Sequence, residues 1–312
     1  MSINLLLAKA FLKGDGPNMS NLIPIIDTHM HLWETKHPEL KWVWLDKDAS
    51  HPILGNIDAI KSVSYVLTDL WAEARFSGIS GFVHVQAAIG SPDPVTETVW
   101  LTEMAKTGPV PMRIIGDSPL GADGAIAQLQ RHQESPLFVG IRDFNAEVMF
   151  KAREIQPKYE ESLKYMAKEG LVFDLDCEWQ NMDEAIKLAN RHPELPIVLE
   201  HIGFPRQRDD EYFNNWKAAI NRLAGCQNVT MKISGVGMTD PLFTRESLRK
   251  WAESSLEAFG ADRTVLGSNW PVDRLFVSYA TMLDFTRDYI SKLSQSEQEK
   301  VCNKNAARLY KF

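Results

Sequence analysis

A histidine pair lies at the end of an apolar, β-rich stretch that covers residues 24–31 and reads PIIDTHMH. Alternate side chains of a strand point the same way, so His29 and His31 are expected on one side of this strand. Two imidazoles directed at one point suit a metal ion, an anion or a proton-transfer site. The alternative is a pair of histidines that pack or meet solvent near a strand end.

Several later β-rich stretches also end in polar residues. In barrels of alternating strands and helices, active sites lie at the carboxyl ends of the strands, so these residues are candidates for one site. Imidazoles, a guanidinium and carboxylates brought together there can bind an oxyanion and activate water. In chain order they are His84 and Gln86, Arg142 and Asp143, Asp174 and Asp176, Glu200 and His201, Lys232 and Ser234, and Ser268, Asn269 and Asp273.

Strands and helices are predicted to alternate along the chain. Short β-branched or apolar runs predict strands at 24–29, 81–86, 111–115, 138–142, 171–175, 196–200, 229–233 and 264–267. Apolar residues spaced three and four apart predict helices at 68–77, 96–107, 123–133, 159–169, 181–192, 212–224, 245–259, 279–293 and 295–309. This alternation is typical of parallel units that close into an α/β fold of the (β/α)8 TIM barrel type. A doubly wound open sheet is the alternative, but its glycine-rich phosphate loop does not follow the first strand.

Length and charge fit a single barrel domain. The 312 residues, of which 44% are hydrophobic, suffice for one large core. The net charge of −7 favours solubility and argues against a nucleic-acid or acidic-lipid surface. Met19 is a second potential start, so we expect residues 1–18 to be an N-terminal appendage and residues 19–312 to form the domain.

The cysteines and the hydropathy of the chain indicate the cellular compartment in which the protein works. The three cysteines are scattered and form no CxxC pair, which argues against a disulfide framework and a thiolate zinc site. No apolar run is long enough to span a membrane. We therefore expect a cytoplasmic protein that acts on a small molecule, without a membrane or nucleic-acid partner. A homo-oligomer is left open.

The segment 32–66 is too long for a simple connection after the first strand. It contains Trp33, Trp42 and Trp44 and is punctuated by proline and glycine. Aromatic loops of this kind often cover a small-molecule site at a barrel mouth, so Trp33 is a candidate for contact with the substrate. The alternative is that these tryptophans pack the loop onto the barrel, and both roles are compatible.

The motifs at the strand ends resemble a known family. The segments are IIDTHMHLW, GFVHVQA, VGIRD, LVFDLD, VLEHIGFP, VTMKISGVG, VLGSNWPVD and the terminal NAARLY, which together cover residues 24–310 in order. They are similar to the amidohydrolase superfamily, specifically the amidohydrolase-related branch that holds sugar lactonases and 2-pyrone-4,6-dicarboxylate lactonase. The ordered set is specific for this branch, although single segments are loose.

The resemblance implies a TIM barrel whose site uses the histidine pair of the first strand, a histidine after the sixth and an aspartate after the eighth. The histidines are His29, His31 and His201 here, which the resemblance implies as catalytic residues and as metal ligands. Arg142 matches an arginine that holds an anion in this branch. Gln86, at the end of the second strand, is a further candidate for contact with the substrate.

The sequence departs from the branch after the eighth strand. Lactonases of the branch commonly read Gly-Ser-Asp-Trp-Pro-Val there, whereas this chain has Asn269 in place of the aspartate. An amide neither accepts the proton nor neutralises a cation. We therefore expect Asn269 to hydrogen-bond the substrate and Asp273 to take over as the catalytic carboxylate. One of the histidines is the alternative base.

These residues lead to a prediction of function. Three imidazoles without the carboxylate predict one weakly held divalent ion, zinc, and a site that works without metal is the alternative. The predicted enzyme is an amidohydrolase-related hydrolase, a lactonase that opens a lactone or similar cyclic ester of a small sugar acid or aromatic-derived acid. One alternative is a metal-dependent non-oxidative decarboxylase. The other is a non-catalytic barrel that binds a small molecule, and Asn269 favours this second alternative.

Overall fold

A computed structural model describes residues 22–312 with the exception of residues 50, 52, 62 and 241. The predicted appendage at residues 1–18, and the start of the predicted domain at residues 19–21, lie outside the described residues.

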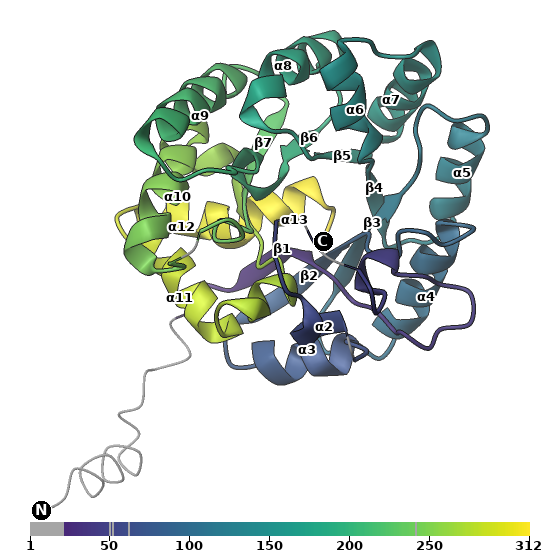
Figure 1. Cartoon of the computed structure of the whole chain (residues 1–312), viewed down its shortest axis with the longest axis horizontal. Helices are drawn as coiled ribbons and strands as arrows, with labels where there is room; N and C mark the ends of the chain where they lie inside the picture. Colours follow the sequence, from purple (N-terminus) through teal and green to yellow (C-terminus); the bar gives the residue numbers. More distant parts are fainter. Residues whose placement is uncertain (1–21, 50, 52, 62, 241) are drawn as a thin grey trace, which may run out of the picture.

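Eight parallel strands form one sheet in the order of the sequence, with helices around them (Figure 1). This arrangement confirms the predicted TIM barrel. Each strand from β1 to β7 pairs in parallel with the next strand in sequence. Each strand also lies within three residues of its predicted position. The strands are β1 (Ile25–Met30), β2 (Ile79–Val85), β3 (Met112–Asp117), β4 (Phe138–Arg142), β5 (Val172–Leu175), β6 (Ile197–Leu199), β7 (Val229–Ile233) and β8 (Thr264–Leu266).

The helices form the outer ring of the barrel (Figure 1). They are α2 (Asp58–Lys61), α3 (Leu67–Ala74), α4 (Val95–Ala105), α5 (Ala125–His132), α6 (Asn145–Ala152), α7 (Pro157–Glu169), α8 (Met182–Arg191), α9 (Asp210–Leu223), α10 (Arg245–Phe259), α11 (Tyr279–Tyr289), α12 (Gln295–Glu299) and α13 (Asn305–Leu309). A π turn at Lys300–Lys304 joins α12 to α13, so the last predicted helix is a single helical stretch. The sequence did not predict α2 or α6. Within the described residues, none of the helices combines the length and apolar character needed to cross a membrane.

Branched apolar side chains fill the space between the strands. Val83, Val139, Val172 and Val198 are buried in one cluster with Tyr310, which follows α13 at the C-terminus. A larger apolar cluster lies between the strands and the surrounding helices. Branched residues pack well on a pleated surface. The two apolar clusters, one inside the barrel and one between strands and helices, make the barrel a rigid support for groups at its rim.

Contacts between β1 and the chain after β8 hold the histidine pair in place. Asp27 accepts hydrogen bonds from the backbone N–H of Ser268 at 2.8 Å and from the hydroxyl of Tyr279 at 2.9 Å. The backbone N–H of Asn269 donates to the carbonyl of His29 at 2.8 Å. Asp27 therefore ties the two ends of the sheet together, and the segment after β8 lies directly beside the histidines.

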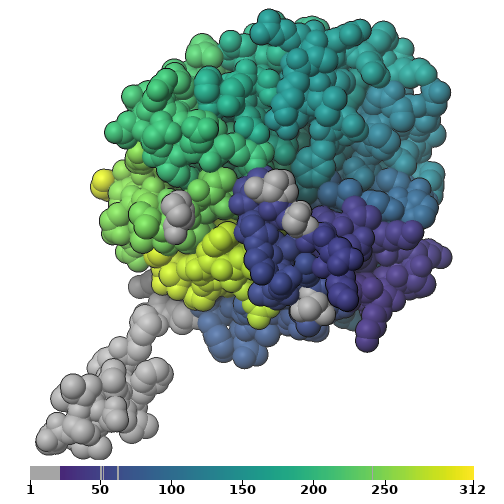
Figure 2. Space-filling model, viewed as in Figure 1, coloured from purple at the N-terminus to yellow at the C-terminus, as the bar shows by residue number. Residues whose placement is uncertain are grey.

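The segment between β1 and α3 folds back over the barrel. Trp33 and Tyr65 exchange backbone hydrogen bonds at 2.9 and 2.8 Å, and the indole N–H of Trp33 donates to the carbonyl of Val63 at 2.7 Å. In Figure 2, the residues coloured purple to blue that follow β1 cover part of the face seen in this view, beside the yellow-green residues near α11. This segment supplies one wall of the site described next.

Candidate active site

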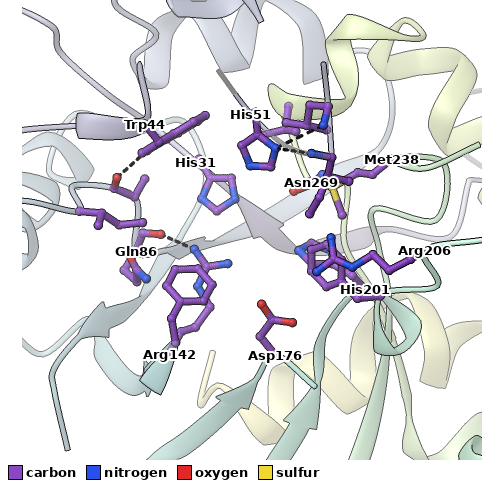
Figure 3. A pocket seen from close by; sticks show the side chains of 17 residues that line it. His31, Trp44, His51, Gln86, Arg142, Asp176, His201, Arg206, Met238 and Asn269 are labelled. Atoms are coloured by element: carbon purple, nitrogen blue, oxygen red, sulfur yellow. Dashed lines mark hydrogen bonds between the residues drawn. The ribbon is translucent and has the colours of Figure 1, made fainter. Parts of the chain in front are cut away.

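A cavity of about 190 Å³ opens where the strand ends and the loops meet (Figure 3). The strand ends supply polar groups to its lining, and the loops supply apolar groups together with His51 and Arg206. The lining residues are His31, Trp44, His51, Ile53, Leu54, Gln86, Ala87, Ile89, Arg142, Phe144, Asp176, His201, Phe204, Arg206, Met238, Asn269 and Val272.

Three histidines meet at one side of this cavity. Nε2 of His29 lies 3.1 Å from Nε2 of His31, and the ring centres of His29 and His201 are 4.3 Å apart. His29 is fully buried, whereas His31 and His201 line the cavity. The structure thus brings together the three histidines predicted from the sequence to form a site.

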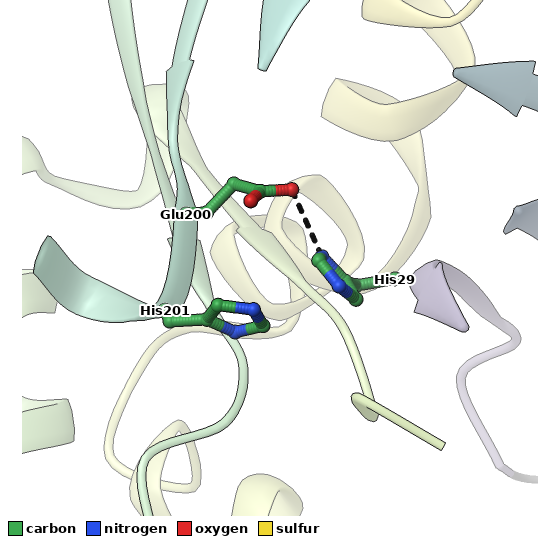
Figure 4. Close-up of side chains that lie close together, drawn as sticks. All are labelled: His29, Glu200 and His201. Carbon is green, nitrogen blue, oxygen red and sulfur yellow. Dashed lines mark ion pairs between the residues drawn. The ribbon is translucent and has the colours of Figure 1, made fainter. Parts of the chain in front are cut away.

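Neighbouring groups determine which nitrogen of each ring carries the proton. Nδ1 of His31 lies 2.8 Å from the carbonyl of Val85, which can only accept, so the lone pair of His31 is on Nε2. Nδ1 of His29 lies 3.2 Å from Oε1 of Glu200, and this carboxylate favours a proton on Nδ1 as well (Figure 4). Two lone pairs then face each other across 3.1 Å, an arrangement that a cation between them would stabilise.

The geometry of this pair fits a metal ion. Zinc with bonds of about 2.0–2.1 Å to nitrogen places tetrahedral ligand atoms roughly 3.3 Å apart. A carbonyl behind His31 and a carboxylate behind His29 are the partners that metal-bound histidines usually have. In His201, Nδ1 lies 2.9 Å from the hydroxyl of Ser234, so Nε2 is left for a ligand.

A second set of potential ligands overlaps with the first. His29, Glu200 and His201 each offer an atom within 4.8 Å of the others. However, Glu200 approaches the nitrogen of His29 that is opposite to the one facing His31. Glu200 also pairs with two cations, since Nη1 of Arg142 lies 3.3 Å and Nζ of Lys232 lies 3.8 Å from its oxygens. We therefore interpret Glu200 as the carboxylate that supports His29.

Burial keeps the histidines neutral. It lowers the pKa of both His29 and His31 well below the ordinary value, and the positive charge of Arg142 lowers the pKa of His31 further. Burial also lowers the pKa of His201 to about 3. For Glu200, burial alone would raise the pKa, but Arg142 and the other nearby cations hold it well below its ordinary range. Neutral imidazoles next to an ionised carboxylate are the protonation states that a metal site requires.

Arg142 extends from the end of β4 into the cavity wall. Its Nη2 donates to the carbonyl of Gln86 at 2.6 Å and its Nη1 to Glu200 at 3.3 Å. The guanidinium lies 4.6 Å from the ring centre of Phe144. Its Nε is buried without a hydrogen-bond partner among the described residues. Arg142 is thus both part of an ion pair and able to donate to a ligand.

Gln86 presents a free amide to the same cavity. Both its side-chain nitrogen and its side-chain oxygen are buried without a hydrogen-bond partner in the described part of the chain. Unpaired buried polar atoms cost free energy. A ligand with one donor and one acceptor would satisfy them.

Asn269 also lines the cavity, and its backbone is in the left-handed region at φ 55°, which asparagine tolerates. Its side-chain Nδ2 donates to Oδ1 of Asp273 at 2.8 Å. Asp273 itself lines a separate, much smaller cavity of about 30 Å³. Burial raises the pKa of Asp273 to about 7, and the hydrogen bond from Asn269 opposes this rise. The structure thus brings Asp273 to Asn269 and away from the cavity that contains the histidines.

Asp176, which directly follows β5, points into the cavity between Arg142 and His201 (Figure 3). The residue is 9% exposed, and its Oδ1 is buried without a hydrogen-bond partner among the described residues. Burial raises its pKa to about 7, the charge of Glu200 adds to this rise, and Arg142 opposes it.

The tryptophans of the long loop divide between two roles. Trp33 is 1% exposed, packs against Trp44 and Tyr65 with ring centres 5.5 and 5.8 Å away, and is not among the residues that line the cavity. Trp44 does line the cavity, and its indole N–H donates to the carbonyl of Ala87 at 2.8 Å. The structure therefore places Trp44, and not Trp33, in the wall of the cavity.

Several residues of this site were not selected from the sequence. Glu200 and Asp176 were recognised as strand-end acids, but nothing in the sequence distinguished them from Asp143 or Asp174. His51, Arg206 and Trp44 come from loops without periodicity, so only the aromatic character of the long loop pointed to one of them.

Comparisons with known proteins agree with this architecture. The sequence profile of a family described as Amidohydrolase matches residues 26–312. An uncharacterised protein of Sinorhizobium fredii, y4mH, is 31% identical over 93% of this chain and 99% of that protein. A protein of Burkholderia multivorans named L-fucono-1,5-lactonase is 23% identical over 91% of this chain and 95% of that protein. A crystal structure of an amidohydrolase from Burkholderia multivorans with bound zinc has a TM-score of 0.79 and 23% identity, and covers 93% of this chain and 99% of that chain.

Proposed function

The chain belongs to the amidohydrolase family, and from this premise we propose that it is a hydrolase that opens a lactone or a similar cyclic ester. The substrate would occupy the cavity with its carbonyl at the histidine cluster. The similarity to a protein named as a lactonase supports this substrate class.

One observation carries the proposal. Nε2 of His29 and Nε2 of His31, which the partners of the two Nδ1 atoms leave unprotonated, lie 3.1 Å apart beside a cavity that also holds Arg142. A cation site and a guanidinium on the walls of one small cavity suit a reaction in which negative charge develops on a carbonyl oxygen. Hydrolysis of a cyclic ester is such a reaction.

The site fits one divalent ion. His29, His31 and His201 would hold it, and a bound zinc ion would supply Lewis-acid polarisation of a carbonyl. We propose weak binding, because no carboxylate completes the set.

The remaining polar residues would bind and orient the substrate. Arg142 can donate to a carboxylate, hydroxyl or carbonyl oxygen of the substrate, and its planar fork suits an oxygen pair. Gln86 and Asn269 would add hydrogen bonds. The apolar walls, which include Trp44 and Phe144, would exclude water from the reacting ester.

We further propose that the protein works in the cytoplasm on a small-molecule substrate. The three cysteines are buried and unpaired in the structure, which fits a reducing compartment.

The proposed function is tested by the purified protein on a panel of sugar lactones and pyrone lactones. Ring opening releases a proton at neutral pH, so a pH indicator reports it, and metal analysis measures bound zinc before and after chelation. We expect His31→Asn to lose zinc and to lower the rate of ring opening at least 100-fold.

A matched control is His192→Asn. His192 is a buried histidine that contacts Glu160 at 2.6 Å, outside the cavity, and its substitution should leave zinc content and activity unchanged. Release of carbon dioxide from an aromatic acid would instead identify a decarboxylase. Binding of lactones without turnover would identify a non-catalytic barrel.

A further inference from the structure

We propose that Asp176 is the general base that deprotonates the attacking water, in place of the aspartate that Asn269 replaces after β8. This inference rests on the proposed lactone hydrolysis. Its geometric basis is that Asp176 is the only carboxyl group among the described residues that line the cavity.

The two residues near the end of β8 are poorly placed for this role. The side chain of Asn269 is an amide, which does not accept the proton of water. Asp273 lies behind Asn269, accepts a hydrogen bond from it at 2.8 Å, and lines a different cavity. Water on a bound ester would therefore meet the amide and not the carboxylate of Asp273.

The histidines have other partners. Nδ1 of His31 is engaged with the carbonyl of Val85, and Nδ1 of His201 with the hydroxyl of Ser234. The remaining nitrogens are those that would hold the metal ion. A nitrogen that binds a cation has no lone pair left for a proton.

Asp176 reaches the cavity and has a carboxylate oxygen that is available to accept a hydrogen bond. It points into the cavity, and its buried Oδ1 has no hydrogen-bond partner in the described part of the chain. The nearest cations are engaged elsewhere: Arg142 pairs with Glu200, and Arg206 pairs with Glu178 at 2.8 Å. An acceptor that no protein group uses is available to a water molecule.

The electrostatic surroundings of Asp176 support this role. Glu200 from the end of β6 and Glu147 on α6 repel a negative charge at Asp176, whereas Arg142 from β4 and Arg206 from the loop after β6 attract it. Burial has the largest effect, and the resulting pKa is about 7. A base of this pKa is partly ionised at neutral pH and is strong enough to take the proton as the water attacks.

One O–H bond of water breaks and its proton moves to Oδ1 of Asp176, while the water oxygen forms a bond to the carbonyl carbon and the carbonyl electron pair moves to its oxygen. When the carbonyl re-forms, the bond from carbon to the ring oxygen breaks. Asp176 returns its proton to that oxygen, and the product is an open hydroxy acid.

The test uses the whole enzyme, with a lactone that the wild type opens, and measures the dependence of kcat/KM on pH. For Asp176→Asn we expect kcat to fall about 10²–10⁴-fold, KM to change little, and the rise of kcat/KM near pH 7 to disappear. Asp176→Glu should keep this rise at a lower kcat. The matched control is Asp117→Asn: the carboxyl of Asp117, at the end of β3, has a pKa raised to about 6 by burial and does not line this cavity, so activity and pH profile should stay unchanged.

Thermal unfolding separates catalysis from a structural role. Removing an unpaired buried carboxylate should raise the Tm of Asp176→Asn at pH 8. If Asp176→Asn retains the rise near pH 7, or if Asp273→Asn removes it, the assignment is overturned while lactone hydrolysis stands. Should Asp176→Asn not fold, a loss of the rise in Asp176→Glu would overturn the assignment. If the wild type opens no lactone of the panel, the proposed function fails and this assignment fails with it.

Discussion

Glu200→Gln tests whether the carboxylate behind His29 holds the site together. The substitution keeps the size of the side chain and removes a charge that faces Arg142 at 3.3 Å and Lys232 at 3.8 Å. At an effective dielectric constant of about 20, these pairs correspond to roughly 5 and 4 kcal/mol of Coulomb energy. Because both cations retain another acceptor, in Gln86 and Asp174, we expect a loss of about 3–5 kcal/mol in the free energy of unfolding and not the sum.

The pH dependence of this loss has a definite sign. The pKa of Glu200 is lowered in the folded protein, so its stabilising effect is complete above the unfolded pKa of about 4.3 and fades as the pH falls through the folded value. Urea unfolding of the metal-free proteins at pH 7 should therefore show the full difference. Below pH 4 the difference should shrink.

The same substitution should weaken zinc binding. A neutral amide favours the proton on Nδ1 of His29 less than a carboxylate does, so Nε2 becomes a poorer ligand, and the expected loss of affinity is about 10–100-fold. Competition with a chromophoric chelator measures this loss in the folded protein. Glu178→Gln is the matched control, because it removes a carboxylate paired with Arg206 at the cavity rim and leaves His29 untouched. Equal zinc affinities of Glu200→Gln and the wild type would refute this account of the site.

Three further outcomes follow from the same contacts. Arg142→Lys keeps a positive charge for Glu200 but loses the planar fork, so KM for the lactone should rise about tenfold with kcat less affected; an unchanged KM would exclude a binding role. Asn269→Asp supplies the missing carboxylate, so zinc affinity measured by chelator competition should increase, and a decrease would contradict the predicted position of the ion. The pKa of Asp176 is about 7 in the folded protein and about 3.9 in the unfolded chain. Its carboxyl group therefore destabilises the folded protein increasingly as the pH rises from 4 to 7. Asp176→Asn should therefore stabilise the protein on the order of 4 kcal/mol at pH 8 and little at pH 3.5, as urea unfolding at the two pH values would show.

The barrel could be predicted because its strands and most of its helices carry strong periodic signals. Helix α6 was missed because its pattern is weak: Val148 lies on its outer side and is 64% exposed, which disturbs the apolar periodicity. The short α2 lies within the loop after β1 and is held by tertiary contacts that the local sequence does not encode. Neither helix changes the order of the strands.

The site could be predicted only in part, because the sequence shows which residues follow a strand but not how far each reaches. Asp174 and Asp176 lie two residues apart at the end of β5, yet Asp174 is held by Lys232 at 2.6 Å whereas Asp176 reaches the cavity. The neighbouring residues Glu200 and His201 both reach the site because the chain leaves the extended conformation at His201, where φ is 49°. Such a backbone conformation depends on the surrounding barrel and has no local signature.

Contact with the cavity separates the polar residues that build the site from those that remain available for chemistry. Glu200, Lys232 and Asp174 form a buried set of paired charges. Oε1 of Glu200 and Oδ1 of Asp174 have no hydrogen-bond partner among the described residues, but both carboxylates pair with Lys232, and none of the three residues lines the cavity. These residues therefore act as support. Asp176 and Gln86 retain buried polar atoms that no described residue satisfies, and both line the cavity. Unpaired buried polar atoms cost free energy, and those that line the cavity can regain it by binding water or a substrate. The chemistry is therefore assigned to the part of the cavity that these two residues line.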